Sequence, residues 1–272
     1  MELKGTVAVI TGGASGIGRG TALAMARAGV DIVLADINES RAASTKAEVE
    51  ALGRRACAVK CDVTRDADIE RLAAVSIQEM GHVDIMMNNA GSVVRGAVEE
   101  ISVADWQWQF DVNVFGVVRG IRAFLPHMLG RGSGYIINTA SIAGLVALTG
   151  EGAPYVASKF AVVGLSESLA LYCRPRGIGV AVLCPGSVNT NLHETGRSIA
   201  MTPERELSET KQAARFQGDR EKQPEEIGEL VVDAVRNDRF FILAEMIHHD
   251  TLVKRTQDLN AFLESRLSEF AS

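Results

Sequence analysis

The sequence predicts an α/β fold in which one doubly wound, parallel sheet of about seven strands has helices on both faces. Three observations support this prediction. Short, continuous apolar segments such as Thr6–Ile10 are typical of strands that are buried on both faces. Segments with helical periodicity follow them, and alternating strands and helices pair as a parallel sheet. The 272 residues suit one large domain that contains all of these elements.

The composition limits the possible partners. Apolar residues make up 47% of the chain and charged residues 23%, and the formal net charge is −6. This balance does not favour nucleic acid or an anionic membrane surface, so small molecules are the expected partners. The four cysteines form no Cys-x-x-Cys pair, residues 1–5 do not begin a signal peptide, and no uncharged apolar run reaches the roughly 18 residues of a membrane span. We therefore expect a cytoplasmic protein with reduced cysteines.

The first expected strand leads into a glycine-rich loop. Residues 11–18 are Thr-Gly-Gly-Ala-Ser-Gly-Ile-Gly, and a helix is expected from there to Gly29. Backbone N–H groups and the helix dipole at such a junction attract a phosphate, while the glycines permit its close approach. The spacing is Gly-x-x-x-Gly-x-Gly rather than Gly-x-Gly-x-x-Gly, and a plain turn is the alternative.

The second expected strand, Asp31–Asp36, ends in a carboxylate. Asp36 lies 18 residues beyond Gly18, close to the interval of about 20 at which an acid accepts a hydrogen bond from an adenosine ribose. A carboxylate there would repel a 2′-phosphate, so the sequence favours NAD over NADP. Arg19 and Arg41 are the cations that could reach the pocket and reverse this preference, although solvated helix positions are the simpler explanation for both.

The rest of the chain repeats the pattern of strands and helices. Glycines end several of the helices, and β-branched residues are enriched in the strands. Asn113, inside the longest expected helix, has a low helix propensity and needs a partner, either a backbone group or water. The further strands are expected at 55–60, 85–87, 135–137, 179–183 and 239–243, and the further helices at 40–52, 66–80, 103–127 and 152–173.

Polar residues follow these strands at the carboxyl edge of the sheet, where open parallel sheets bind ligands. Asp62 could accept from an adenine amine or cap the next helix, and the residues alone favour the cap. Asn88–Gly91 could tie strand ends together, flank a ribose or form a plain turn. Ser141 and the segment Pro185–Thr190 emerge at the same edge, with a cap or turn as the alternative for Ser141.

Tyr155 and Lys159 lie four residues apart in a segment that begins after Pro154 and continues as a long apolar helix. They therefore share one face of that helix. A nearby cation favours the phenolate and brings the pKa of a tyrosine down from about 10 toward the working range, so the pair suits proton transfer. A buried tyrosine whose hydroxyl finds a partner is the alternative.

Taken together, these motifs resemble the short-chain dehydrogenase/reductase family, in its single-domain branch. The resemblance covers residues 5 to about 190. It implies a Rossmann-type fold and an NAD-dependent oxidoreductase that transfers a hydride between the nicotinamide and a secondary alcohol or ketone. The motifs that carry it are residues 11–18, Asp36, Asn89-Ala90-Gly91, Asn113, Ser141, Tyr155-Val-Ala-Ser-Lys159 and residues 185–190 (Pro-Gly-Ser-Val-Asn-Thr).

The resemblance also implies a role for each site residue, and it implies no metal. Tyr155 would transfer the proton at the substrate oxygen, Lys159 would be its cationic partner and a ribose ligand, Ser141 would orient that oxygen, and Asn113 would hold a proton-relay water. The implied cofactor ligands are Gly12, Ser15, Gly16, Ile17 and Gly18 at the pyrophosphate; Asp62 and Val63 at adenine; Asn89, Ala90 and Gly91 along the cofactor; and Pro185, Gly186, Val188 and Thr190 near the nicotinamide.

Two segments depart from many relatives. The polar residues 191–223 are expected to form a substrate lid, and family lids vary too much to transfer a substrate. Residues 244–272 form a C-terminal extension with a charged helical pattern from Thr251 to Leu267, which puts the family's common tetrameric packing in doubt. A homodimer or homotetramer is still expected, through the apolar faces of helices 103–127 and 152–173.

The substrate and two alternative functions remain open. The expected apolar walls would suit a hydrophobic or cyclic substrate, although packing residues would look the same. A non-enzymatic NAD sensor could use the same fold, and an intact Ser141, Tyr155 and Lys159 argues against it. An epimerase or dehydratase would resemble a longer branch of the family, and the about 80 residues after Thr190 leave little room for its larger C-terminal domain. The expected wall residues are Val93, Val94, Ile142, Leu145, Val146, Leu148 and Val188.

Overall fold

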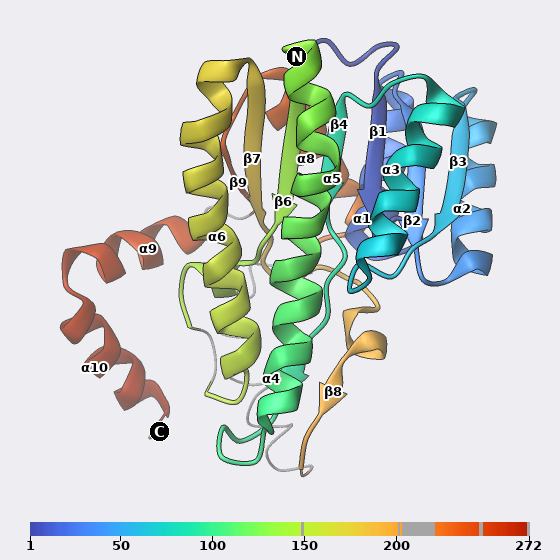
Figure 1. Ribbon diagram of the computed structural model, residues 1–272. Helices are drawn as coiled ribbons and strands as arrows, with labels where there is room; N and C mark the ends of the chain where they lie inside the picture. Colours follow the sequence, from blue (N-terminus) through green and yellow to red (C-terminus); the bar gives the residue numbers. More distant parts are fainter. Residues whose placement is uncertain (148–149, 201, 203–220, 245–246, 271–272) are drawn as a thin grey trace.

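The computed structural model describes residues 1–272 except 148–149, 201, 203–220, 245–246 and 271–272 (Figure 1). Seven strands form one sheet in the order β3-β2-β1-β4-β6-β7-β9, and every neighbouring pair is parallel. The predicted doubly wound sheet is confirmed. The strands are β1 Val7–Thr11, β2 Asp31–Asp36, β3 Ala56–Lys60, β4 Ile85–Asn88, β6 Gly134–Thr139, β7 Ile178–Cys184 and β9 Phe241–Leu243.

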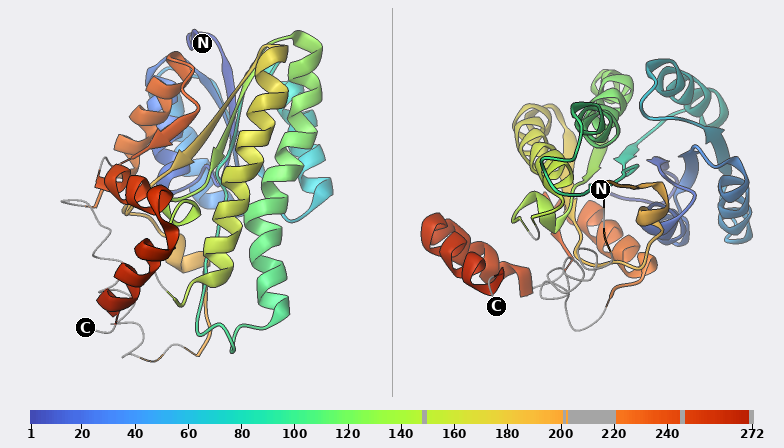
Figure 2. Two further views of the ribbon diagram at one scale, coloured as in Figure 1. Left: turned by 90° about the vertical axis from the view of Figure 1, so that its left-hand side faces the viewer. Right: turned by 90° about the horizontal axis from the view of Figure 1, so that it is seen from below.

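Helices cover both faces of the sheet because each strand alternates its apolar side chains between them. In β1, Val7 and Val9 point into a core shared with α3, α5 and α6, whereas Ala8 and Ile10 point into a core shared with α1, α2 and α8. Figures 1 and 2 show these two layers on opposite sides of the strands. The helices are α1 Gly16–Arg27, α2 Glu39–Ala51 and α8 Pro224–Arg236 on one face, and α3 Asp66–Met80, α5 Gly116–Arg131 and α6 Ala153–Cys173 on the other.

The strand order reverses direction between β1 and β4. From β1 the chain builds outward to β2 and β3, then returns to place β4 on the opposite side of β1 and continues to β6, β7 and β9. In a parallel sheet, the loops that leave two such strands diverge to opposite faces and open a crevice at their carboxyl ends. This crevice is where the glycine loop and the residues after β4 meet.

The expected helix 103–127 consists of two α-helices joined by a wider turn. Helix α4 spans Val103–Phe110, Asp111–Phe115 form a π-helical turn, and α5 continues to Arg131. Within the turn, the N–H of Gly116 donates to the carbonyl of Asp111, five residues earlier. Turns of this kind occur frequently at functional sites. The turn contains Asn113, the residue whose place in a helix was unexplained.

A small second sheet brings part of the expected lid against the loop after β4. Strand β5, Val94–Arg95, pairs in parallel with β8, Arg197–Ser198, directly after the 3-10 turn η4, Leu192–Thr195. Val188, which precedes this segment, forms a parallel bridge with Lys222. Of the expected lid 191–223, the structure describes residues 191–200, 202 and 221–223.

The C-terminal extension forms two helices rather than the one expected from Thr251 to Leu267. Helix α9 spans Ile247–Gln257 and α10 spans Leu259–Phe270, with Asp258 between them. Both lie beside the main body, away from the sheet (Figures 1 and 2). The guanidinium of Arg255 lies 5.4 Å from the ring centre of Phe160 on α6, which is one contact between the extension and the main body.

One helical segment in the described part of the chain, 153–176, is long and apolar enough to cross a membrane by length and composition. Core helices of globular proteins pass the same test. Here the segment is α6 with a following 3-10 turn, and side chains such as Val162 and Leu169 pack into the core against the sheet. Its apolar character is therefore explained by its place in the fold.

Candidate functional site

The residues expected to bind cofactor and substrate meet in one cavity of about 850 Å³ at the carboxyl edge of the sheet. Two of them do not line it: Gly18 lies behind the glycine loop, and Asn113 lies behind the loop after β4. The expected residues that do line it are Gly12, Ser15, Gly16, Ile17, Asp36, Asp62, Val63, Asn89, Ala90, Gly91, Ser141, Tyr155, Lys159, Pro185, Gly186, Val188 and Thr190.

The glycine loop is shaped so that a phosphate can reach the N-terminus of α1. Gly12 and Gly16 have φ values of 62° and 49°, which favour glycine. A Cβ atom on Gly18 would lie 2.1 Å from the carbonyl oxygen of Gly12, so a side chain there would displace the loop. Ser15 is the N-cap of α1 but makes no side-chain cap hydrogen bond. The first N–H groups of the helix are thus available to an anion, and the loop fits a pyrophosphate.

Asp36 and its neighbours form the next part of the cavity. One carboxylate oxygen of Asp36 accepts a hydrogen bond from the N–H of Asn38 at 2.9 Å. Arg19 does not line the cavity, because its guanidinium binds Glu48 and Glu225. Arg41 does line it, and it forms an ion pair with Glu194.

Asp62 does not cap the helix that follows it. Its Oδ1 accepts from both the N–H and the hydroxyl of Thr64, at 2.9 and 2.7 Å. The N-cap of α3 is instead Arg65. The preferred expectation of a helix cap is therefore wrong: the carboxylate closes a local turn, and this turn holds Asp62 and Val63 at the edge of the cavity.

Asn89 ties three strand ends together. Its side-chain nitrogen donates to the carbonyl of Thr11 at the end of β1 at 3.0 Å, and its side-chain oxygen accepts from the hydroxyl of Thr139 at the end of β6 at 3.3 Å. The expected possibility that residues 88–91 tie strand ends together is thus realised by Asn89. It fixes the floor of the crevice across β1, β4 and β6.

Helix α6 places Tyr155 and Lys159 one turn apart, facing the end of β6. The Nζ atom of Lys159 lies 5.6 Å from the ring centre of Tyr155 and donates to the carbonyl of Thr139 at 3.0 Å. Ser141, two residues beyond Thr139, hydrogen-bonds the side chain of Tyr155. The hydroxyl of Ser141 also accepts a hydrogen bond from the N–H of Ala143. Ser141 therefore caps a turn, as the alternative expected, and lies in the candidate site as well.

Burial dominates the electrostatics of this group. It raises the pKa of Tyr155 above its ordinary value near 10, while the hydrogen bond from Ser141 and the charge of Arg95 lower it in part. Burial also lowers the pKa of Lys159 to about 8. The expectation that Lys159 brings the tyrosine pKa down is therefore not met in this structure: desolvation of the phenolate raises the pKa, and the groups that lower it in part are Ser141 and Arg95.

Asn113 acts from behind the cavity through three hydrogen bonds. Its side-chain oxygen accepts from the N–H of Ser92 at 2.9 Å, and its nitrogen donates to the carbonyl of Ser92 and to the hydroxyl of Ser158, both at 3.0 Å. Ser158 in turn donates to the carbonyl of Tyr155 at 2.7 Å. The expected backbone partner of Asn113 is confirmed, and the side chain connects the loop after β4 to the helix that carries Tyr155.

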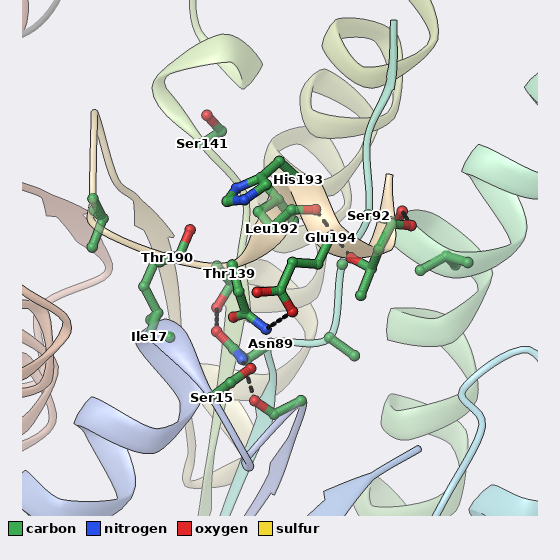
Figure 3. A pocket seen from close by; sticks show the side chains of 18 of the residues that line it. Ser15, Ile17, Asn89, Ser92, Thr139, Ser141, Thr190, Leu192, His193 and Glu194 are labelled. Carbon is green, nitrogen blue, oxygen red and sulfur yellow. Dashed lines mark hydrogen bonds between the residues drawn. The ribbon is translucent and has the colours of Figure 1, made fainter. Parts of the chain in front are cut away.

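The expected apolar walls are mostly wrong. Of the expected wall residues, Val188 lines the cavity. Four others are buried packing residues: Val93, Val94, Ile142 and Val146. Leu145 is half-buried and does not line the cavity, and Leu148 lies outside the described residues. Several lining residues had no sequence signal. Figure 3 shows some of them, with Leu192, His193 and Glu194 in the same pocket as Ser141 and Asn89. The unexpected lining residues include Ser92, Arg95, Trp108, Val112, Leu192, His193 and Glu194.

Comparisons with known proteins agree with this geometry. Residues 6–199 match the family model described as short chain dehydrogenase. The chain is 36% identical over 251 residues to 3beta-hydroxysteroid dehydrogenase 2 of Eggerthella lenta, covering 91% of this chain and 94% of that protein. It is 34% identical over 242 residues to cyclohexanol dehydrogenase of an Acinetobacter species, covering 89% and 92%. A crystal structure of a short chain dehydrogenase/reductase from Burkholderia phymatum in complex with NAD superposes with a TM-score of 0.87 at 34% identity, covering 96% of each chain.

Proposed function

Because this chain belongs to the short-chain dehydrogenase/reductase family, we propose that it is an NAD-dependent dehydrogenase acting on a hydrophobic or cyclic secondary alcohol, or on the corresponding ketone. The family membership establishes an oxidoreductase with a nicotinamide cofactor. The preference for NAD and the substrate class are the parts that we propose.

The observation that carries the proposal is the convergence of Ser141, Tyr155 and Lys159 on one end of the cavity. Ser141 lies in the loop after β6, Tyr155 and Lys159 lie on helix α6, and all three side chains line the same space. A sensor that only bound the dinucleotide would not need a hydroxyl bonded to the phenol and a buried ammonium 5.6 Å from its ring. The group is arranged for proton transfer to and from a substrate oxygen.

The proposed chemistry assigns one task to each residue. As the C–H bond of an alcohol breaks, negative charge develops on the oxygen, and the hydroxyls of Ser141 and Tyr155 stabilise that charge. Tyr155 takes the alcohol proton during oxidation and returns it to the ketone oxygen during reduction. Its raised pKa keeps the phenol protonated at neutral pH, which suits donation to a ketone. Lys159, held by the carbonyl of Thr139, supplies the cation beside the phenol.

Asn113 enters the proposal as a positioning residue. It holds the Ser92 loop against α6, and through Ser158 it fixes the first turn of the helix that carries Tyr155. The resemblance also implies that Asn113 holds a proton-relay water. Its side-chain oxygen has one acceptor site beyond the bond from Ser92, which leaves capacity for such a contact.

The cavity residues fit NAD from one end to the other. The glycine loop would hold the pyrophosphate, Asp36 would accept from the adenosine ribose, and Asp62 and Val63 would flank the adenine. Asn89, Ala90 and Gly91 would lie along the cofactor, with Pro185, Gly186, Val188 and Thr190 near the nicotinamide. When bound, the nicotinamide supplies the acceptor or donor of the hydride.

The substrate class rests on the relatives and on the far end of the cavity. The two relatives named above act, by their names, on a steroid hydroxyl and on cyclohexanol. In this chain Trp108, Val112 and Leu192 contribute apolar surface to the same cavity as Ser141 and Tyr155. We further propose that residues 191–223, of which 201 and 203–220 lie outside the described residues, form a lid over the substrate. We also propose that the enzyme is cytoplasmic, where its four unpaired cysteines remain reduced.

The experiment is a screen of the purified protein with NAD against a panel of secondary alcohols. The panel includes cyclic, steroidal and linear members, and NADH absorbance reports turnover. We expect turnover of cyclic, hydrophobic members. The proposed substrate class fails if none of the cyclic and steroidal alcohols is oxidised while NADH binding is normal by titration, and the absence of turnover with every member of the panel would favour a binding module.

A further inference from the structure

An ion pair joins helix α2 to the 3-10 turn η4 at the cavity. Nη2 of Arg41 on α2 lies 2.9 Å from Oε2 of Glu194 on the 3-10 turn Leu192–Thr195. The two residues are 153 positions apart in the chain, and both line the cavity. Asn191 also donates to the same oxygen of Glu194, at 3.4 Å. The pair thus joins two segments that lie far apart in the sequence and both line the cavity.

Arg41 belongs to the same turn as the carboxylate that faces the ribose. The N–H of Arg41 donates to the side-chain oxygen of Asn38 at 3.0 Å, and the N–H of Asn38 donates to Asp36. Among the described residues that line the cavity, three are lysine or arginine. Lys159 is bound to Thr139 beside the catalytic residues, and Arg95 lies in β5. Arg41 is therefore the basic residue at the Asp36 end of the cavity.

A guanidinium in this place is the chemical group that binds a 2′-phosphate in an NADP site. In this structure it is already bound to a carboxylate. Arg41 also lowers the pKa of Glu194 through their hydrogen bond, so Glu194 is ionised at neutral pH. The Asp36 end of the cavity thus has the carboxylates of Asp36, Asp62 and Glu194, and the guanidinium of Arg41.

We propose that Glu194 is a determinant of cofactor selectivity: it occupies Arg41 and thereby keeps this guanidinium from binding the 2′-phosphate of NADP. The inference rests on the NAD preference proposed above and deepens it. Asp36 repels the phosphate directly, and Glu194 removes the cation that would compensate for that repulsion. Selectivity is in this way shared between the nucleotide-binding half of the chain and the lid.

The size of the effect follows from the exposure of the pair. The side chains of Arg41 and Glu194 are 45% and 47% exposed. Solvent and salt screen such a pair, and its coupling is modest. We therefore expect Glu194→Gln to lower the ratio of the dissociation constants, NADPH over NADH, by about five-fold rather than by orders of magnitude. Glutamine keeps the shape of the side chain and its contact with Asn191, so the change removes mainly the charge.

The test is a fluorescence titration of NADH and NADPH with wild type, Glu194→Gln, Arg41→Gln and the double variant. The matched control is Glu50→Gln, which removes an equally exposed carboxylate from a pair with Lys46 on the same helix as Arg41 but outside the cavity. We expect the ratio to fall in Glu194→Gln, to return to the wild-type value in the double variant and to stay unchanged in the control. Thermal melting curves establish that each variant is folded.

The outcomes separate this inference from the function on which it rests. If wild type prefers NADH but Glu194→Gln leaves the ratio unchanged, the role of Glu194 is overturned while the NAD preference stands. If Glu194→Gln and the double variant bind NADPH equally tightly, Arg41 does not bind the phosphate even when it is released from Glu194, and the inference is again overturned. If wild type binds both cofactors equally, the proposed NAD preference itself fails, and the inference fails with it.

Discussion

The carboxylate of Asp36 accepts a hydrogen bond from the backbone N–H of Ala14 at 3.0 Å. This bond joins the end of β2 to the middle of the glycine loop. Asp36 therefore has two tasks: it would face the ribose, and it holds the phosphate-binding loop in place. Removal of its charge should therefore affect both ribose binding and the position of the loop.

Asp36→Asn should weaken NADH binding by about ten-fold or more, since hydrogen bonds to charged groups contribute roughly 1.5–3 kcal/mol. NADPH binding should weaken less, because the repulsion of the 2′-phosphate is also removed. Titration of both cofactors measures this. Glu39→Gln is the control, because Glu39 is an exposed carboxylate that pairs with Lys60 outside the cavity. An equal loss for both cofactors would show that Asp36 acts through the loop alone.

Tyr155→Phe should abolish turnover while leaving NADH binding nearly intact. The variant removes the oxygen that transfers the proton but keeps the ring and its packing. Steady-state rates beside NADH titration measure both effects, and Ser141→Ala should lower kcat with a smaller effect on binding. Near-normal turnover in Tyr155→Phe would end the assignment of Tyr155 as the acid/base.

Reduction and oxidation should depend on pH in opposite directions. Because burial raises the pKa of Tyr155, the phenol is the dominant form at neutral pH, and ketone reduction should be independent of pH there and decline in alkali. Alcohol oxidation needs the basic form and should increase steadily with pH. Profiles of kcat/KM in both directions, with a stability control at each pH, check this. An oxidation rate that already reached its plateau near pH 7 would contradict the raised pKa.

Lys159 should contribute to activity at a cost in stability. Burial lowers its pKa from 10.5 to about 8, so between these values the unfolded chain binds more protons and the free energy of unfolding rises with pH. Below about pH 8 the buried ammonium costs about 3 kcal/mol, of which the bond to Thr139 returns about 1 kcal/mol. Lys159→Met should therefore be inactive and bind NADH less tightly, yet melt several degrees higher at pH 7.

Thermal melting at pH 7 and pH 10 measures this effect. The advantage of Lys159→Met over wild type should shrink at pH 10, where wild-type Lys159 is already neutral in the folded protein. Lys254→Met on α9 is the control, since it removes a lysine charge far from the sheet. A lower melting temperature for Lys159→Met at pH 7 would mean that the hydrogen bond to Thr139 outweighs the desolvation.

The protein should be at least a dimer at micromolar concentration. Large apolar side chains are exposed on the outer helices, with Phe115 at 53%, Leu171 at 81% and Tyr172 at 49%. The family resemblance points to the same helices. Light scattering measures the mass, and Leu171→Glu should shift it toward the monomer. A monomeric wild type would contradict the prediction.

The sequence predicts those helices and strands that are long enough for a pattern of buried and exposed residues to be recognised. A segment such as Asp31–Asp36 is buried almost throughout, so its continuous apolar pattern identifies the strand. Strands β5 and β8 have only two residues each, which is too short for any periodicity. The same limit applies to contacts between distant residues: Arg41 and Glu194 are each ordinary surface residues in sequence, and only the fold brings them together.

The sequence predicts the site residues whose side chains have a chemical role and that follow a strand or share a helix face. It does not predict the residues that line the cavity only because of how the side chains pack. Tyr155, Lys159 and Ser141 were found because their residue types and spacing imply a task. The walls were missed because a valine in the core and a valine in a pocket have the same hydrophobicity. Val94 is fully buried, whereas Val188 lines the cavity, and the sequence holds no signal that separates them. Asp62 was misassigned because an Asx turn and a helix cap use the same residue types.

Because of the wide turn at Asp111–Phe115, the number of residues in this part of the chain matters for the structure as much as their types. The turn holds about one residue more than an α-helical turn, so a single deletion inside it would give a regular helix with the flanking helices facing nearly the same way. A deletion between Gln109 and the turn would instead rotate the preceding residues by about 100° relative to those that follow. Gln109, fully buried and bonded to the carbonyl of Ser92 at 2.8 Å, would then face away from the loop that it supports. Insertions and deletions, which surface loops accept readily, should therefore be excluded from the regular helix beside the turn even when each individual substitution is tolerated.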